Sequence, residues 1–171
     1  MIRQIEERDI PALIELGAEM HAESSFADVP FDRQRVENMA WHCLHNADWF
    51  GAVAEHDGRI VGMFVGNAGP FYFSTTQAGF DKVWYVTPEC RRSIHGVRLL
   101  QAFLRWCGAR ELIFVRIGVS TGVNPAGTDR LMQRLGFTAV GGNYSLKLNP
   151  AGQPAFGNTQ PDTGESAAFP V

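Results

Sequence analysis

Residues 86–100 have the sequence VTPECRRSIHGVRLL, in which the end of a strand is followed by a polar turn and then by a helix. Apolar residues at positions 97, 100, 104 and 107 recur with helical spacing. A helix N-terminus presents unpaired N–H groups and a positive dipole end, which together bind phosphate. Arg92 and Ser93 would add side-chain contacts, and Gly96 lets a ligand approach the first turn closely. The stretch predicts a site for the pyrophosphate of a nucleotide-like cofactor; an ordinary capped turn with surface arginines is the alternative.

Hydrophobic periodicity on either side of this stretch predicts helices and strands in a mixed order. Strands are expected over residues 3–5, 50–55, 59–67, 79–86, 112–119 and 144–148, and helices over 10–22, 32–45, 96–107 and 128–135. The 112–119 strand is expected to be buried, because it is apolar apart from Arg116. Asp57-Gly58 is typical of a tight hairpin, and Gly108 is expected to end its helix. Since the hairpin needs antiparallel neighbours and strand–helix–strand needs a parallel crossover, we expect an α/β fold with a mixed sheet flanked by helices.

Length and composition indicate one globular domain. Of the 171 residues, 45% are hydrophobic and 19% are charged. We expect the domain to span residues 1–148, because residues 149–171 contain four Pro and three Gly but no Lys or Arg, which is typical of a disordered tail. No apolar run is long enough to cross a membrane, no signal sequence is visible, and the three cysteines share no metal-ligand spacing. These features predict a cytoplasmic protein without a metal site.

Charge is distributed unevenly along the chain. Residues 1–57 contain twelve acidic residues and four arginines, whereas residues 58–148 contain eleven basic residues and four acidic ones. The two parts either simply fold against each other or form a bipolar site, with an anion held by the middle of the chain and a cation near the N-terminal part. The net charge of −3 argues against a nucleic-acid-binding protein.

The 86–100 stretch resembles the acyl-CoA-binding motif of the GNAT N-acetyltransferase superfamily. That motif is Gln/Arg-x-x-Gly-x-Gly/Ala after a strand, and the sequence from Arg91 to Gly96 matches its first and last positions. The segment from Asn124 to Phe137 is similar to the family's Asn…Gly-Phe segment. The resemblance covers about residues 1–148 and implies the GNAT-like fold, with six or seven strands and about four helices. It implies an enzyme that transfers acetyl from acetyl-CoA to a primary amine of a small molecule or protein, by direct attack in a ternary complex.

The resemblance also implies where acetyl-CoA would bind, namely in a V-shaped opening between the strand ending at Val86 and the strand ending near Val119. Backbone groups near Val86 would also polarise the thioester carbonyl. The implied cofactor-binding residues are Trp84, Tyr85 and Val86 along the pantetheine arm, Arg91, Arg92, Ser93, Ile94, His95, Gly96 and Val97 around the pyrophosphate, and Asn124 at the pantetheine.

Transfer to an amine needs a base, because an ammonium group has no lone pair. In the family this base can lie on the strand before the motif, which makes Asp81 the candidate. The alternative is a solvated surface carboxylate, since counting from the motif puts Phe80 at the usual position and a one-residue offset reverses the side of the strand. The loop containing His21, Glu23 and Ser24 borders the acceptor site in the family. These three residues are predicted to bind the amine, and an exposed polar loop is the alternative.

Two positions depart from the family pattern. Ile94 stands where the motif has its first glycine, and Met132 stands four residues before Gly136, where many members have a Tyr that protonates the departing thiolate. Methionine has no proton to donate. Either another group or water supplies this proton, or the protein is a catalytically weak or inactive scaffold that only binds ligands.

The expected partners are acetyl-CoA and an amine, with no nucleic acid, membrane or metal. The acidic residues 1–57 favour a cationic acceptor such as a polyamine, an aminoglycoside or a protein amino group. The sequence is compatible with a homodimer and does not decide the oligomeric state.

Overall fold

The computed structural model describes residues 1–146, and the predicted disordered tail over 149–171 lies outside these residues. The chain divides into a unit of Met1–Val140 and a unit of Gly141–Val171. In the second unit the described residues form no helix or strand, so the start of the strand predicted over 144–148 is absent, and its last two residues lie outside the described part. The predicted domain boundary at residue 148 stays a prediction.

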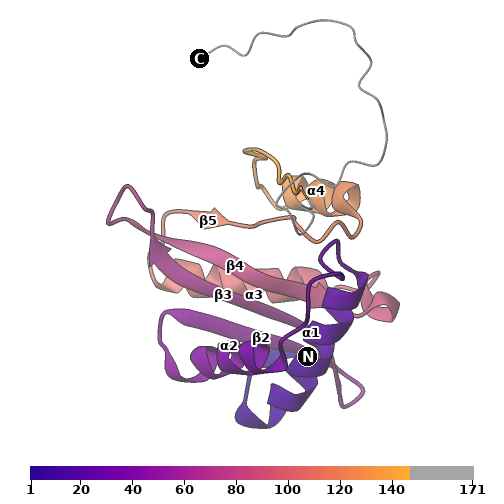
Figure 1. Cartoon of the computed structure of the whole chain (residues 1–171). Helices are drawn as coiled ribbons and strands as arrows, with labels where there is room; N and C mark the ends of the chain where they lie inside the picture. The colour runs from indigo at the N-terminus through magenta and orange to yellow at the C-terminus, as the bar shows by residue number, and fades with distance from the viewer. Residues whose placement is uncertain (147–171) are drawn as a thin grey trace, which may run out of the picture. The chain divides into compact units, whose positions relative to one another are not determined.

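The first unit is built on a mixed sheet with the strand order β1-β2-β3-β4-β5 (Figure 1). Neighbouring strands are antiparallel except for the parallel pair of β4 and β5. Asp57 and Gly58 have φ values of 49° and 74° in the turn between β2 and β3, which confirms the predicted hairpin. The strands are β1 (Ile2–Gln4), β2 (Trp49–His56), β3 (Arg59–Pro70), β4 (Gln77–Val86) and β5 (Val115–Arg116).

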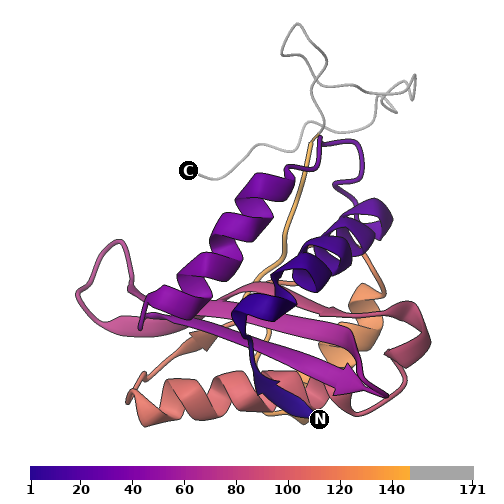
Figure 2. The same ribbon diagram turned by 90° about the horizontal axis from the view of Figure 1, so that it is seen from below.

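Helices cover both sides of this sheet. They are α1 (Ile10–Glu23), α2 (Arg33–His45), α3 (His95–Ala109) and α4 (Pro125–Arg134), with short 3-10 turns η1 (Glu7–Asp9) and η2 (Pro88–Cys90). Figure 2 shows α1 and α2 on one face and α3 on the other. Asp32 caps α2, since its side chain accepts a hydrogen bond from the N–H of Arg35. The order of elements predicted from the sequence is confirmed as far as α4.

The sheet separates two hydrophobic cores. One core packs α1 and α2 against residues such as Val53, Met63 and Val65, and the other packs α3 against Phe64. Phe103 of α3 is fully buried and stacks on the ring of Phe64, with 4.7 Å between ring centroids. Each face of the sheet is thus fixed by a separate set of apolar contacts.

Two glycines let α3 approach the sheet closely. A Cβ atom at Gly66 of β3 would lie 2.6 Å from Cε2 of Phe103 and 2.9 Å from the carbonyl oxygen of Phe80. A Cβ atom at Gly79 of β4 would lie 2.6 Å from Sγ of Cys107 and 3.3 Å from Cζ of Phe103. These distances are too short for a side chain, so Phe103 occupies the space that the glycines leave.

Three elements differ from the prediction. The described residues contain five strands instead of six or seven, and β5 has only two residues of the predicted 112–119 strand. This segment is not buried, because β5 is the edge of the described sheet and its neighbours Ile113 and Phe114 are exposed. Helix α3 continues past Gly108 to Ala109, and the chain reverses at Glu111, whose φ is 56°. Helix α4 begins at Pro125, where proline fits a helix start.

The close approach of α3 leads to a first prediction. Gly66→Ala should lower the free energy of unfolding by about 1–3 kcal/mol, because the new methyl overlaps Phe103 and the Phe80 carbonyl. Thermal unfolding should show a fall in Tm of roughly 2–4 °C for each kcal/mol. The matched control is Gly69→Ala in the same strand, where the nearest atom to a new Cβ is Nδ2 of Asn67 at 3.5 Å. An equal loss of stability in both variants would contradict this account.

Candidate functional site

Strands β4 and β5 separate soon after they pair. Their backbone pairing is limited to Gly79 with Val115 and Phe80 with Arg116, while β4 continues to Val86. A cavity of about 340 Å³ lies in the resulting opening. Its wall is formed by the end of β4, the turn before α3, the first turn of α3, residues 118–124 and the start of α4. We call it the β4–β5 cavity.

A β-bulge in β4 turns Asp81 toward this cavity. Val65 of β3 pairs with Val83, but the next residue, Gly66, pairs with Asp81, so Lys82 is an extra residue in β4. The side chain of Asp81 lines the cavity, and its Oδ1 accepts a hydrogen bond of 2.8 Å from the N–H of Gly118. Asp81 is half-buried, and the bulge interrupts the alternation of side chains on which the residue count relied, so its role as the base stays a prediction.

Burial raises the pKa of the Asp81 carboxyl above its ordinary value. The hydrogen bond from Gly118 and the positive charge of Lys82 act in the opposite direction but do not cancel this rise. A carboxylate whose pKa is shifted toward neutral pH is a better proton acceptor than an exposed one. The arrangement can therefore take up a proton from a group bound in the β4–β5 cavity.

Arg91 lies at the end of the cavity beside the last residue of β4. Its Nε donates a 3.0 Å hydrogen bond to the carbonyl oxygen of Val86, and its guanidinium forms an ion pair with Glu23 of α1. The guanidinium carbon also lies 5.6 Å from the centroid of the Tyr85 ring. Arg92 is exposed and does not line the cavity. Of the two arginines predicted at the phosphate site, the structure brings only Arg91 to the cavity.

The turn before α3 places Ser93, Gly96 and Val97 on the cavity wall. Ser93 Oγ donates to the carbonyl oxygen of Cys90 at 2.6 Å and accepts from the N–H of His95 at 3.2 Å, which fixes the entry into the helix. Gly96 lies beside the indole of Trp84, whose Nε1 donates to the Gly96 carbonyl oxygen at 3.2 Å. The start of α3 thus faces the cavity with its first-turn N–H groups.

The fold agrees with comparisons to known proteins. A model of the GNAT acetyltransferase family matches residues 14–137, which is most of the chain. The chain belongs to the GNAT acetyltransferase family. No curated protein matches the sequence.

Solved structures of GNAT acetyltransferases show the same fold at low sequence identity. An acetyltransferase from Trypanosoma brucei is 22% identical, with a TM-score of 0.66 over 86% of this chain and 99% of that chain. The aminoglycoside acetyltransferase AAC(6')-Iy, solved with a CoA bisubstrate analogue, is 16% identical, with a TM-score of 0.70 over 87% of this chain and 97% of that chain. A ribosomal-protein-alanine N-acetyltransferase from Brucella melitensis is 18% identical, with a TM-score of 0.62 over 87% and 99%.

Two residues of the GNAT motif stand apart from the β4–β5 cavity. Ile94 caps α3 and is 54% exposed, so its side chain, which replaces the motif glycine, does not fill the cavity. His95 lies next to His56 of the β2–β3 turn, with 5.4 Å between ring centroids. Its Nδ1 is buried without a hydrogen-bond partner in the described part of the chain. Burial, with a smaller contribution from His56, lowers the pKa of His95.

The Asn124–Phe137 segment is divided between cavity and core. Asn124 lines the cavity and starts α4 with a left-handed φ of 47°, and its side-chain oxygen accepts a 3.2 Å hydrogen bond from the N–H of Gly127. Met132, at the position of the GNAT tyrosine, is 7% exposed and packs in the core beneath α3. Ser120 and Thr128, two hydroxyl residues not predicted to be in the site, line the cavity. Ser120 lies in a segment without a motif, so only its position after β5 could have drawn attention to it, whereas Thr128 lies within the Asn124–Phe137 segment.

The predicted acceptor residues are spread over two spaces. Glu23 lines the β4–β5 cavity, whereas His21 and Ser24 line a neighbouring chamber of about 270 Å³ beneath α1 and α2. Ser24 is buried: its Oγ donates to the His21 carbonyl oxygen at 2.9 Å and accepts from the N–H of Phe26 at 3.1 Å. Ser24 therefore serves the local turn, and the expectation of an exposed polar loop is wrong at this residue.

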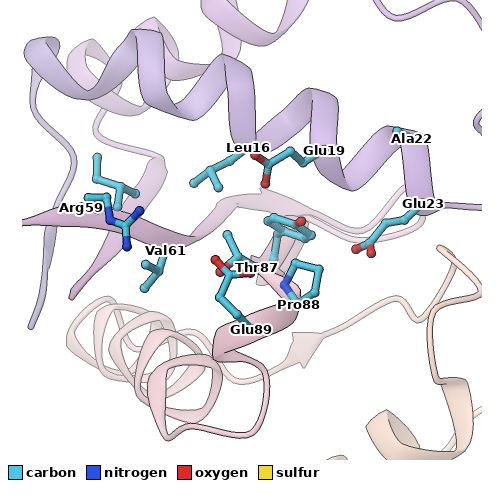
Figure 3. Close-up of a pocket in the computed structure, with 11 residues that line it drawn as sticks. Leu16, Glu19, Ala22, Glu23, Arg59, Val61, Thr87, Pro88 and Glu89 are labelled. Carbon is cyan, nitrogen blue, oxygen red and sulfur yellow. The ribbon is translucent and has the colours of Figure 1, made fainter. Parts of the chain in front are cut away.

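Glu23 also borders an open recess between α1 and the end of β4 (Figure 3). Glu19 and Glu23 point into it from α1, and Glu89 and Arg59 line it from the other sides. Tyr85 lies at its base, where burial together with Glu23 and Glu19 raises the pKa of the Tyr85 hydroxyl to about 12. The recess, at about 640 Å³, is wider than the β4–β5 cavity, and charged side chains line both spaces.

The part of the chain that the structure describes contains no cluster of three or more metal-ligating side chains. Within the same residues, no helix is both long and apolar enough to cross a membrane.

From the burial of Asp81 we predict that its negative charge lowers the free energy of unfolding. Because its pKa is raised in the folded state, the ionised form is disfavoured there, and stability is lost as the pH rises through this pKa. Asp81→Asn keeps an oxygen for the Gly118 N–H but removes the charge. It should raise Tm at neutral pH and change it less at about pH 3, below the ordinary aspartate pKa.

The measurement is thermal unfolding at both pH values, with Asp48→Asn as an exposed control. A loss of stability in Asp81→Asn that is larger at neutral pH than at acid pH would refute the assignment.

Proposed function

We propose that the protein transfers the acetyl group of acetyl-CoA to a primary amine in a ternary complex, without a covalent enzyme intermediate. The observation that carries this proposal is the β4–β5 cavity, which has a proton-accepting carboxylate on one wall and the start of α3 at its end. Acetyl-CoA supplies an activated acyl thioester, and the residues of the cavity fit its chemistry. An anionic pyrophosphate suits Arg91 and a helix N-terminus, and a polar arm suits an unpaired strand edge.

Cofactor binding is divided among three elements. Arg91, Ser93 and the N–H groups of Gly96 and Val97 bind the pyrophosphate. The edge of β4 from Trp84 to Val86, which has no partner strand on the β5 side among the described residues, pairs with the pantetheine arm in the manner of an added strand. Asn124 supports the same arm through its side-chain amide, since its oxygen already caps α4.

Binding of an anion requires Arg91 to exchange partners. Its guanidinium is shared between Glu23, the Val86 carbonyl oxygen and the Tyr85 ring. A pyrophosphate carries two negative charges, against one on Glu23 and none on the Val86 carbonyl, so it attracts the guanidinium more strongly than either. Arg91 therefore turns toward the phosphate, and the carboxylate of Glu23 becomes available to the amine substrate.

Asp81 acts as the base that removes the amine proton, directly or through one water molecule. Oδ1 is held by Gly118, which fixes the carboxylate and leaves Oδ2 for the proton. Backbone N–H groups at the open edge of β4 polarise the thioester carbonyl. Met132 is buried and has no proton to give, so the departing thiolate takes its proton from Ser120, Thr128 or water.

A catalytically inactive scaffold is the second candidate, and the observation that favours it is the replacement of the GNAT tyrosine by the core residue Met132. The exposed side chain of Ile94 gives this candidate no support, because it leaves the cavity open. Binding of CoA without release of free CoA from acetyl-CoA in the presence of any amine would establish the scaffold.

Calorimetric titration with CoA tests the phosphate site. Arg91→Gln should weaken binding by about tenfold to a hundredfold, because one charge-assisted contact is lost. Arg92→Gln is the matched control, since Arg92 is adjacent in sequence but exposed outside the cavity. Equal losses in the two variants, or no binding by the unaltered protein, would overturn the assignment.

Turnover tests the base. Asp81→Asn should lower kcat by about a hundredfold or more while the Kd for CoA stays unchanged. In the unaltered protein, kcat should fall as the pH drops through the raised pKa of Asp81, because the protonated carboxyl cannot accept a proton. The variant should lose this acid limb. A variant that retains both its rate and its pH profile would exclude Asp81 as the base.

A further inference from the structure

The neighbouring chamber beneath α1 and α2 adjoins the β4–β5 cavity. Met20, Lys82, Val83, Ser120 and Thr121 line both spaces and form their shared edge. Because Asp81 lines the β4–β5 cavity next to this edge, a molecule held in the chamber lies beside the base proposed above. We call this space the apolar chamber.

The wall of the apolar chamber is mostly apolar, and its polar side chains are those of His21, Ser24, Lys82, Ser120 and Thr121. Phe31, Val36 and Met39 come from the α2 side, and Met63 and Val65 come from the sheet. None of its lining residues within the described chain is acidic, and its one lysine or arginine is Lys82 at the shared edge. A polyamine or an aminoglycoside would have to bury several ammonium groups here without a carboxylate. The acidic residues of 1–57 therefore do not make this chamber a cation site.

The apolar chamber differs from a packing defect in two ways. An interior of this size seldom contains an empty space larger than a few waters, and about 270 Å³ corresponds to roughly nine of them. The chamber also includes His21, whose Nε2 is buried and has no hydrogen-bond partner in the described residues. An unpaired buried nitrogen costs free energy unless a ligand or water meets it.

The volume limits what can enter. An apolar protein cavity of about 150 Å³ holds benzene. The apolar chamber, at about 270 Å³, has room for one aromatic ring or a branched aliphatic group with a short linker. A larger body would need the helices to move apart.

We infer that the acceptor is a primary amine with a small apolar body, such as a single aromatic ring on a short alkyl linker, which binds in the apolar chamber with its amine at the shared edge. This inference rests on the proposed acetyltransferase function. Burial disfavours the ammonium form of such an amine, and Asp81, beside the shared edge, accepts its proton, so that the nitrogen attacks the thioester with its lone pair free. An amide bond forms, the thioester carbon–sulfur bond breaks, Asp81 or its water takes the amine proton and the thiolate regains one.

The experiment compares amines and variants. Release of free CoA from acetyl-CoA is measured with 2-phenylethylamine, ethanolamine and spermidine, and binding of 2-phenylethylamine to the CoA-loaded protein is measured by calorimetry. Val36→Phe narrows the apolar chamber. Arg35→Phe adds the same ring one residue away on the exposed side of α2 and serves as the control. Phe31→Ala, which widens the apolar chamber, is the second variant in case Val36→Phe does not fold.

We expect the highest kcat/KM with 2-phenylethylamine. Val36→Phe should lower this value and the binding affinity by about tenfold or more, while Arg35→Phe stays within about twofold. Phe31→Ala should shift the preference toward a two-ring amine. CoA binding should not change in Val36→Phe, because Val36 does not line the β4–β5 cavity.

Two results would overturn the inference while leaving the proposed function in place: a higher kcat/KM with spermidine, or equal effects of Val36→Phe and Arg35→Phe. If CoA binds but no amine releases free CoA, the proposed function fails. In that case the calorimetry still tests the apolar chamber as a binding site. The chamber is excluded if 2-phenylethylamine does not bind, or if it binds and Val36→Phe does not weaken the binding.

Discussion

The packing of Phe103 on Gly66 and Gly79 is the constraint on which the rest of the structure depends. The ring occupies the positions that side chains would take on two adjacent strands, with 2.6 Å from its Cε2 to a Cβ built at Gly66. This contact sets the distance between α3 and the sheet. It lies next to the bulge in β4 and next to the short stretch where β4 pairs with β5. The start of α3 and the open edge of β4 can face the same cavity only because the helix is held at this distance.

Asp81 links the architecture of the opening to its chemistry. Its Oδ1 accepts the N–H of Gly118, a donor that a longer β5 would direct to a backbone carbonyl of β4. The side chain thus takes the place of the next ladder hydrogen bond, which is a physical reason for the end of β5 at Arg116. The same partial burial that this contact requires raises the pKa of the carboxyl. Because its pKa is raised, the ionised Asp81 carboxylate destabilises the fold, and this is the residue proposed to accept the proton. Such a loss of folding stability is common at functional sites.

Local sequence signals predicted the elements well and their mutual alignment poorly. Helical spacing, the Asp57-Gly58 turn and the strand–turn–helix of 86–100 depend on neighbouring residues, and each is present in the structure. The bulge at Lys82 depends on how β3 and β4 align, which no local pattern reveals. Counting along the strand therefore assigned Asp81 to the wrong side. The prediction of a buried strand over 112–119 was wrong for a related reason. Its apolar residues indicate burial only if a further strand covers them.

The position of His95 and Ile94 shows the same limit within a recognised motif. Both lie in the sequence predicted to bind phosphate, yet His95 packs on His56 and Ile94 faces solvent, because the turn that enters α3 directs consecutive side chains in different directions. The motif specifies the backbone, whose N–H groups would bind the phosphate, and leaves these side chains to other neighbours. Arg91 and Arg92 separate for the same reason.

The uneven charge of the chain has its clearest structural consequence at Arg91. The ion pairs of Arg3, Arg8 and Arg33 join residues within 1–57, with Asp9, Glu6 and Glu15 among their partners. Some acidic residues of 1–57 are therefore paired with arginines of the same part. Neutralisation between residues 1–57 and 58–148 does not account for the whole charge distribution. The Arg91–Glu23 pair does cross between the parts, and it does so at the β4–β5 cavity. An anion that draws Arg91 away leaves Glu23 unpaired between the cavity and the recess beside α1. The charge asymmetry thus supports a bipolar site with one arginine and one glutamate at its centre, and it leaves the apolar chamber free to select its ligand by shape.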